Sequence, residues 1–223
     1  MLVVFARFTN DEDLSLGGWP ANREVPNYVD TVTGAMPSFL FSNTSDFNTY
    51  STCRSISNFY KTMSNGTFTF LGDALKKNGK PYSIKIDPTG LTASWGAINR
   101  RVLEQIDVQV PGFNCTPYDL HENNPNYLKD ASVTGPDNIL DYVAIIYRYD
   151  NNWADSLQPI PGLGSTLGSA GGISTLNTSV ILANGYKIST GYTHTGNAGD
   201  TLWSRNTFIH EIGHELFNAQ GKL

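Results

Sequence analysis

The stretch Ile139-Leu-Asp-Tyr-Val-Ala-Ile-Ile-Tyr-Arg-Tyr149 is the segment that decides the fold. Its middle is apolar on both faces, which is typical of a strand in the centre of a sheet. The start of the chain, LVVFARF over Leu2–Phe8, has the same character and predicts a second buried strand. We therefore expect a sheet with the 139–149 strand near its centre.

Helical spacing of apolar residues predicts helices over residues 50–63 and 94–106. Asn65-Gly66 would end the first helix, since these residue types accept the left-handed backbone of a helix C-terminus. A third helix is predicted from about residue 201 to 218, with Asp200 as its N-cap. The chain thus contains at least three segments that could cover a sheet.

Further strands are predicted where the residue type alternates or a turn signal occurs. Residues 67–71 and 82–86 alternate between apolar and polar side chains, so the two segments could pair as strands. Residues 179–183 and 186–190 flank Asn184-Gly185, a strong hairpin signal. The order of elements predicts an α+β, α/β-like protein with a mixed twisted sheet and backing helices. The length of 223 residues fits one domain spanning 1–223.

The composition restricts the class of function. Charged residues make up 16% of the chain, against about 25% in typical globular proteins, and uncharged polar residues replace them. Such a surface is more typical of secreted proteins. The net charge is −5 and the 15 Lys and Arg residues form no basic stripe, so we expect no nucleic-acid partner. No apolar run reaches the roughly 18–20 residues of a membrane span, so no transmembrane segment is predicted.

The stretch Phe208-Ile-His-Glu-Ile-Gly-His-Glu-Leu-Phe217 contains the pattern HExxH at residues 210–214. On a helix, residues four apart lie on the same face, so His210 and His214 can both bind one Zn²⁺. Glu211 would face the same cavity and act as general base toward water. Zinc lowers the pKa of bound water from 15.7 toward about 7, which makes this deprotonation feasible near neutral pH.

The surroundings of HExxH predict an amphipathic helix. Phe208, Ile209, Ile212 and Leu216 share one face, and the two histidines lie on the opposite face. Gly213 would let another segment approach the helix closely, at a cost of about 1 kcal/mol in helix propensity. We therefore expect one face in the core and the other presenting two imidazoles.

The sequence FIHEIGHELF resembles the active-site helix of secreted immune-inhibitor-A-like metallopeptidases. The segments 2–10, 57–68 and 140–146 are similar to further elements of those domains. The resemblance implies a zincin fold and a secreted zinc-dependent endopeptidase made with a leader and a propeptide. It also implies that the partner is a protein or peptide substrate, and we expect the chain to be a monomer.

The sequence departs from the extended pattern HExxHxxGxxH/D of related zinc peptidases. Phe217 occupies the glycine position and Gln220 the position of the third ligand. A catalytic zinc site needs three protein ligands, so we expect the third ligand beyond Leu223. The first residues lack the basic and long apolar regions of a leader peptide. We therefore expect this chain to be incomplete at both ends.

Other candidate residues carry weaker signals. Cys53 and Cys115 form either one disulfide or two buried free thiols, and the sequence leaves both open. His194 could line the cleft, although a surface loop is the favoured position, and His121 with Glu122 is expected in solvent, as is Glu215. Structural Ca²⁺ is a secondary expectation, since oxygen ligands without EF-hand spacing occur at Asp150, Asn151, Asn152 and Asp155.

Three functions stay open on these residues. The favoured one is an endopeptidase whose extended substrate pairs with an edge strand, for which the 179–190 hairpin is the candidate. A non-catalytic binding or adhesion module with a degenerate zincin site is the rival, and Phe217 and Gln220 favour it. An aminopeptidase-like enzyme with a distant Glu as third ligand is the second enzymatic alternative.

Overall fold

The computed structural model describes residues 1–11, 18–33, 55–68, 70–92, 94–120, 135–148, 179–188 and 192–195, together with 206, 208–210 and 212–213. For residues 192–195 the backbone alone is described. Within this part of the chain no helix is long and apolar enough to cross a membrane.

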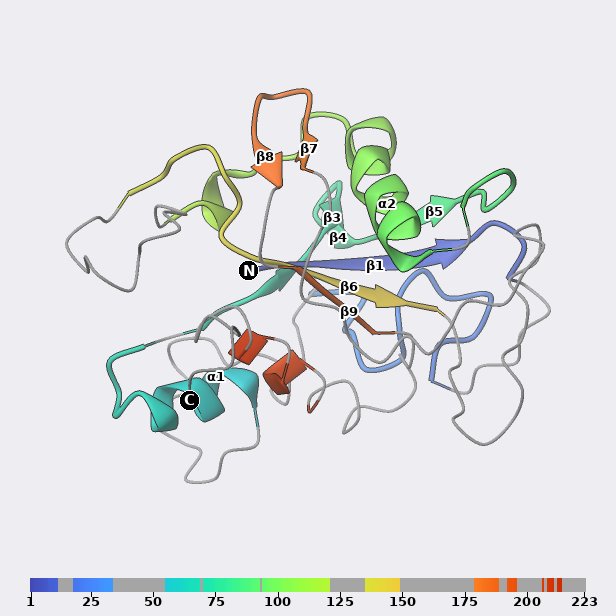
Figure 1. Ribbon diagram of the computed structural model, residues 1–223. Helices are drawn as coiled ribbons and strands as arrows, with labels where there is room; N and C mark the ends of the chain where they lie inside the picture. Colours follow the sequence, from blue (N-terminus) through green and yellow to red (C-terminus); the bar gives the residue numbers. More distant parts are fainter. Residues whose placement is uncertain are drawn as a thin grey trace.

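The sheet is built around two parallel strands from distant parts of the sequence. β1 (Leu2–Phe8) pairs with β6 (Val143–Tyr147), with Leu2 opposite Val143. Every residue of both strands is buried, as expected for strands covered on both faces. β9 (Tyr192–Thr195) pairs parallel to β6 on its other side (Figure 1). The predicted strand at the start of the chain is confirmed, and the strand predicted over 139–149 is confirmed over Val143–Tyr147.

The opposite edge of β1 is occupied by two short strands in succession. β2 (Asp73–Ala74) pairs with its first residues and β5 (Ser83–Ile86) with its last ones, both parallel. Between them the chain forms a hairpin of β3 (Lys76–Lys77) and β4 (Lys80–Pro81). Its turn residues Asn78 and Gly79 have φ of 52° and 76°, the left-handed values that a two-residue hairpin turn requires.

Helices cover the two faces of the sheet. α2 (Trp95–Gln109) packs on the face formed by Leu2, Val4 and other residues of the same parity. α1 (Ile56–Met63) packs on the face formed by Val3 and Phe5. Figure 1 shows α2 above the sheet and α1, with the C-terminal helical segment, below it. The predicted combination of a sheet with backing helices is therefore confirmed.

Local signals set the helix ends. The side chains of Ser55 and Ser94 accept hydrogen bonds from the backbone N–H groups of Asn58 and Ala97, which caps the first turn of each helix. After α1, Asn65 and Gly66 take positive φ values, and the Gly66 N–H donates to the carbonyl of Lys61 at 2.7 Å. The predicted end of this helix is thus confirmed, while residues 50–54 lie outside the described part.

One prediction about the sheet is wrong. Residues 67, 68, 70 and 71 form no strand, because the Phe68 and Phe70 rings instead pack against Tyr60 of α1. β5 accordingly pairs with β1. The described strands of this sheet are all parallel, and the antiparallel pairing within the described residues lies in two separate two-stranded ladders. The expectation of a mixed sheet therefore stays a prediction for the rest of the chain.

The predicted hairpin after residue 179 is confirmed. β7 (Val180–Ile181) and β8 (Lys187–Ile188) pair antiparallel. The Leu182 N–H donates to the Tyr186 carbonyl at 2.8 Å, and Gly185 takes a φ of 88° in the turn. Earlier in the chain, residues Thr116–Tyr118 form a 3₁₀ turn.

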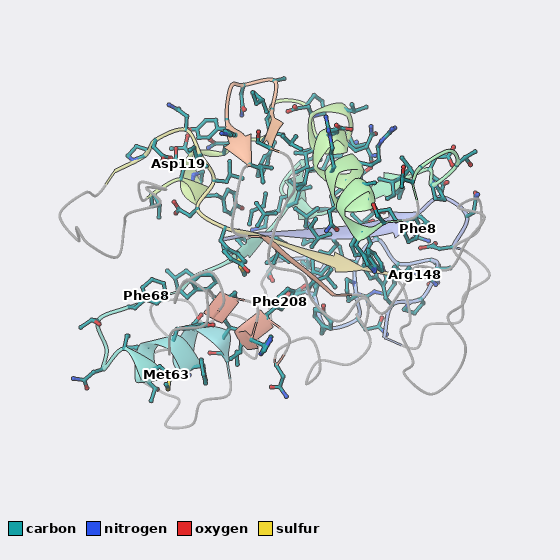
Figure 2. All side chains as sticks on the ribbon, viewed as in Figure 1. Phe8, Met63, Phe68, Asp119, Arg148 and Phe208 are labelled. Carbon is teal, nitrogen blue, oxygen red and sulfur yellow. The ribbon has the colours of Figure 1, made fainter. Side chains whose placement is uncertain are left out.

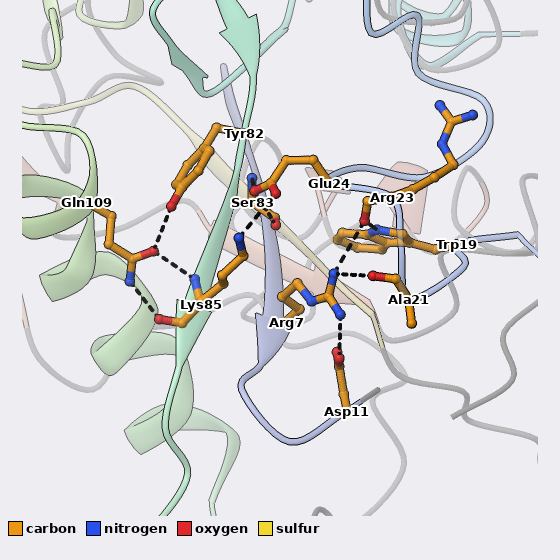
Figure 3. Close-up of polar contacts among 10 residues, drawn as sticks. All are labelled: Arg7, Asp11, Trp19, Ala21, Arg23, Glu24, Tyr82, Ser83, Lys85 and Gln109. Carbon is orange, nitrogen blue, oxygen red and sulfur yellow. Dashed lines mark hydrogen bonds and ion pairs between the residues drawn. The ribbon is translucent and has the colours of Figure 1, made fainter. Parts of the chain in front are cut away.

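Side chains cap the outer edge of β5. The Gln109 amide accepts from the Lys85 N–H at 3.0 Å and donates to the Lys85 carbonyl at 2.6 Å, as a neighbouring peptide group would. Glu24 accepts from the Ser83 N–H at 3.1 Å (Figure 3). The backbone groups of an open strand edge pair readily with another chain. These two side chains therefore protect this edge.

We predict that Gln109→Leu makes the protein self-associate, because the Lys85 backbone groups lose their partner and can pair with a second copy. Gln105→Leu is the matched control, since Gln105 lies one turn earlier on α2 and accepts from the Gln109 amide at 3.2 Å, whereas Gln109 itself holds the Lys85 backbone groups. Sedimentation velocity over a concentration series should show larger species for Gln109→Leu alone. Equal sedimentation of both variants would contradict the capping role.

Candidate metal centre

The segment carrying the HExxH pattern is helical where the structure describes it. Residues 206, 208–210 and 212–213 have helical backbone. Phe208 and Ile212, one turn apart, are both 0% exposed. Because residues at this spacing lie on one face of a helix, the segment buries a single apolar face.

That apolar face packs on the underside of the sheet, next to α1. Phe208 and Ile212 belong to the same buried cluster as Ile56 and Tyr60 of α1 and Phe5 of β1. Figure 2 shows Phe208 on the same side of the sheet as Phe68 and Met63. The docking of this segment therefore depends on both α1 and the central strands.

His210 is exposed, on the side of the helix away from Phe208 and Ile212. Two residues rotate a helix by about 200°, which accounts for this opposition. The predicted division into an apolar face and a histidine face is confirmed for these three residues. Glu211 and His214 lie outside the described residues, so their predicted roles stay predictions, as do those of Glu215, Phe217 and Gln220.

The Tyr60 hydroxyl connects α1 to this segment by a hydrogen bond. It donates to the backbone carbonyl of Ile209 at 2.6 Å, and the two residues are 149 positions apart. Burial raises the pKa of the Tyr60 phenol, so the hydroxyl stays a donor. The sequence analysis placed Tyr60 in a predicted helix and in the segment 57–68 that resembles the metallopeptidases, and it assigned no partner to the hydroxyl. A leucine at position 60 would have fitted the apolar pattern equally well. The presence of a tyrosine there is the signal that could have indicated a hydrogen bond.

A buried ion cluster lies at the carboxyl ends of β1 and β6. Asp11 accepts from Arg7 at 2.7 Å and lies 3.1 Å from Arg148, with all three side chains buried. Arg148 also donates to the Trp19 carbonyl at 2.8 Å. The cluster thus fixes the loop after β1 onto the sheet, and Figure 2 places Arg148 near Phe8 at this end. The sequence analysis missed this cluster, although an arginine inside an apolar strand, such as Arg7, indicates a buried charge that needs a partner.

A cavity of about 300 Å³ opens beside this cluster, at the ends of β1 and β5. Its charged lining residues are Arg7, Arg23, Glu24 and Lys85. Lys85 pairs with Glu24 at 3.2 Å, and Arg7 pairs with Asp11. None of the lining residues belongs to α1 or to the helical segment around His210. The cavity is therefore not evidence for a substrate cleft at the HExxH pattern.

The hairpin of β7 and β8 lies on the other face of the sheet. Val180, Leu182 and Ile188 pack in the cluster around α2, and the Ala183 N–H donates to Asp107 of α2 at 2.7 Å. The hypothesis that this hairpin forms the substrate edge above the HExxH helix is therefore wrong. A hairpin's position in the sequence, immediately before a helix, does not determine which face it covers.

The next strand, β9, is the outermost strand on that side of the described sheet. His194 lies in it, in register with Ile145 of β6. The expectation that His194 lies in a loop is therefore wrong.

Several secondary candidates are placed only in part. Cys115 is a buried free thiol, and burial raises its pKa. Cys53, His121, Glu122 and the residues 150–155 lie outside the described part of the chain. Among the residues that the structure describes, no group of three or more His, Cys, Asp or Glu side chains could hold a metal ion.

Comparison with known proteins gives no family assignment. No protein-family model matches the chain. No curated protein matches it either.

We predict that Ile212→Ala destabilises the protein by about 2–5 kcal/mol, as for other fully buried isoleucines. Ile181→Ala is the matched control, because Ile181 is 69% exposed, and it should cost under about 1 kcal/mol. Urea unfolding would measure both free energies. Equal effects would show that the HExxH segment is not docked on the sheet in solution.

We predict that Cys115 is alkylated in unfolded protein without any reductant, because its sulfur is free. In the folded protein the reaction should be slow, since burial both shields the thiol and disfavours the thiolate. Mass spectrometry of iodoacetamide-treated samples checks both statements. A Cys115 peptide that is modified only after reduction would contradict the free thiol.

Proposed function

We propose that the protein is a secreted zinc-dependent endopeptidase of zincin type, similar to immune-inhibitor-A-like metallopeptidases. The observation that carries the proposal is that residues 206, 208–210 and 212–213 are helical, with Phe208 and Ile212 buried and His210 exposed. A helix that continues to His214 would present both imidazoles on this exposed face. The secreted location rests on the resemblance and on the uncharged polar surface.

The residues that the proposal uses fit zinc by their chemistry. Imidazole nitrogens are ligands that Zn²⁺ prefers, and two of them at positions i and i+4 suit one ion. When bound, the zinc ion would polarise the substrate carbonyl and lower the pKa of water. A catalytic zinc site also needs a third protein ligand besides His210 and His214.

The chain's own residues would handle binding and proton transfer. His210 and His214 would hold the metal, with their helix fixed by Phe208 and Ile212 against the sheet. Glu211 would accept a proton from the attacking water and later donate it to the leaving amine. An extended peptide would pair with an exposed strand edge. The capped edge of β5 is unsuited to this, which favours the β9 side of the sheet.

We predict that Glu211→Gln lowers kcat for casein hydrolysis by about 10²–10⁴-fold, the usual contribution of a general base. Zinc content should stay unchanged, because Glu211 is not a proposed ligand. Glu215→Gln is the matched control, since it removes one carboxylate from the same helix on a face expected in solvent. Activity is measured with the intact chain, and zinc by atomic absorption.

The same experiment separates the alternatives. Protein that takes up no zinc, or whose Glu211→Gln variant cleaves casein as fast as the unmodified protein, would contradict the proposal. Zinc uptake without any cleavage would favour the rival, a binding module with a degenerate zincin site. Release of N-terminal amino acids alone would favour an aminopeptidase.

A further inference from the structure

We propose that Tyr60 of α1 is a positioning residue for the metal-binding helix. The inference rests on the proposed function and deepens it. It assigns to the Tyr60 hydroxyl the task of fixing the backbone immediately before His210.

The contact is directional, which the surrounding apolar contacts are not. The Tyr60 hydroxyl lies 2.6 Å from the Ile209 carbonyl oxygen, and the side chain is 2% exposed. Burial of Ile56, Phe208 and Ile212 brings the two helices together, but hydrophobic contact permits sliding and rotation. A hydrogen bond of this length permits little of either. It therefore sets the rotation of the helix, and with it the direction of His210.

The bond falls where the helix is intrinsically weak. In an α-helix the Ile209 carbonyl accepts from the N–H of Gly213, four residues later. Glycine in a helix interior costs about 1 kcal/mol relative to alanine. A carbonyl oxygen has two lone pairs and can accept the Tyr60 hydroxyl in addition. The external donor thus supports the turn that contains His210 and Glu211.

Tyr60 is itself held rigidly. Its ring meets those of Phe59, Phe68 and Phe70 at centroid distances of 5.2, 6.3 and 5.9 Å. Ser57 of α1 donates a hydrogen bond to the Phe70 carbonyl. The phenol is therefore held by contacts that do not involve the segment around His210, as a positioning group requires.

The test compares Tyr60→Phe with Tyr147→Phe. Both changes delete one buried phenol hydroxyl, and the Tyr147 hydroxyl donates to Asn99 at 2.8 Å on the α2 face of the sheet. The control thus loses a similar bond without touching the HExxH segment. We would measure amide hydrogen exchange over residues 206–213 in metal-free protein, zinc affinity by chelator competition, and kcat and KM for a peptide.

For Tyr60→Phe we expect exchange over residues 206–213 to accelerate about 3–10-fold, as loss of one hydrogen bond predicts. Zinc affinity should fall about 10-fold, the usual effect of removing a group that orients ligands. kcat should fall more than KM rises, because displaced groups affect chemistry more than substrate binding. Tyr147→Phe should leave all three unchanged.

Each outcome decides one of two questions. Unchanged exchange over 206–213 in Tyr60→Phe, or an equal change in both variants, overturns the positioning role. Accelerated exchange with unchanged zinc affinity also overturns it, since the bond then stabilises the helix without directing ligands. If the unmodified protein binds no zinc, the proposed function fails, and the assignment of Tyr60 to metal positioning fails with it. The exchange data would still show whether Tyr60 anchors the helix.

Discussion

The parallel pairing of β1 with β6 is the constraint on which the rest of the structure depends. Both strands are buried along their whole length, so each face of the sheet must be covered. α2 covers one face, and α1 with the HExxH segment covers the other. The candidate metal-binding helix is therefore part of the core, and its docking and the stability of the sheet support each other.

The two faces have different tasks. The α2 face is closed by the hairpin of β7 and β8 and by the side-chain cap on β5, so it serves packing and protection of the edge. The other face carries His210 on a helix that α1 fixes through apolar contacts and one hydrogen bond. The buried cluster of Arg7, Asp11 and Arg148 holds the loop after β1 at the carboxyl ends of β1 and β6.

Local sequence signals predicted the helices and strands well. They predicted poorly which of these elements contact one another. Apolar runs, helical spacing and Asn-Gly turns identified β1, β6, both helices and the hairpin, since nearby residues determine these. Alternating aromatics at Phe68 and Phe70 predicted a strand wrongly, because their burial depends on α1. The face covered by the hairpin, the partner of the Tyr60 hydroxyl and the pairing of the arginines depend on residues far along the chain.

The sequence distance between β1 and β6 has a consequence for biosynthesis. Leu2 pairs with Val143, so β1 leaves the ribosome long before its partner exists. At 5–20 residues per second this delay is on the order of ten seconds. During that time an apolar strand is exposed, and such a strand invites aggregation and chaperone binding. The sheet can therefore form only after residues 143–147 have been synthesised.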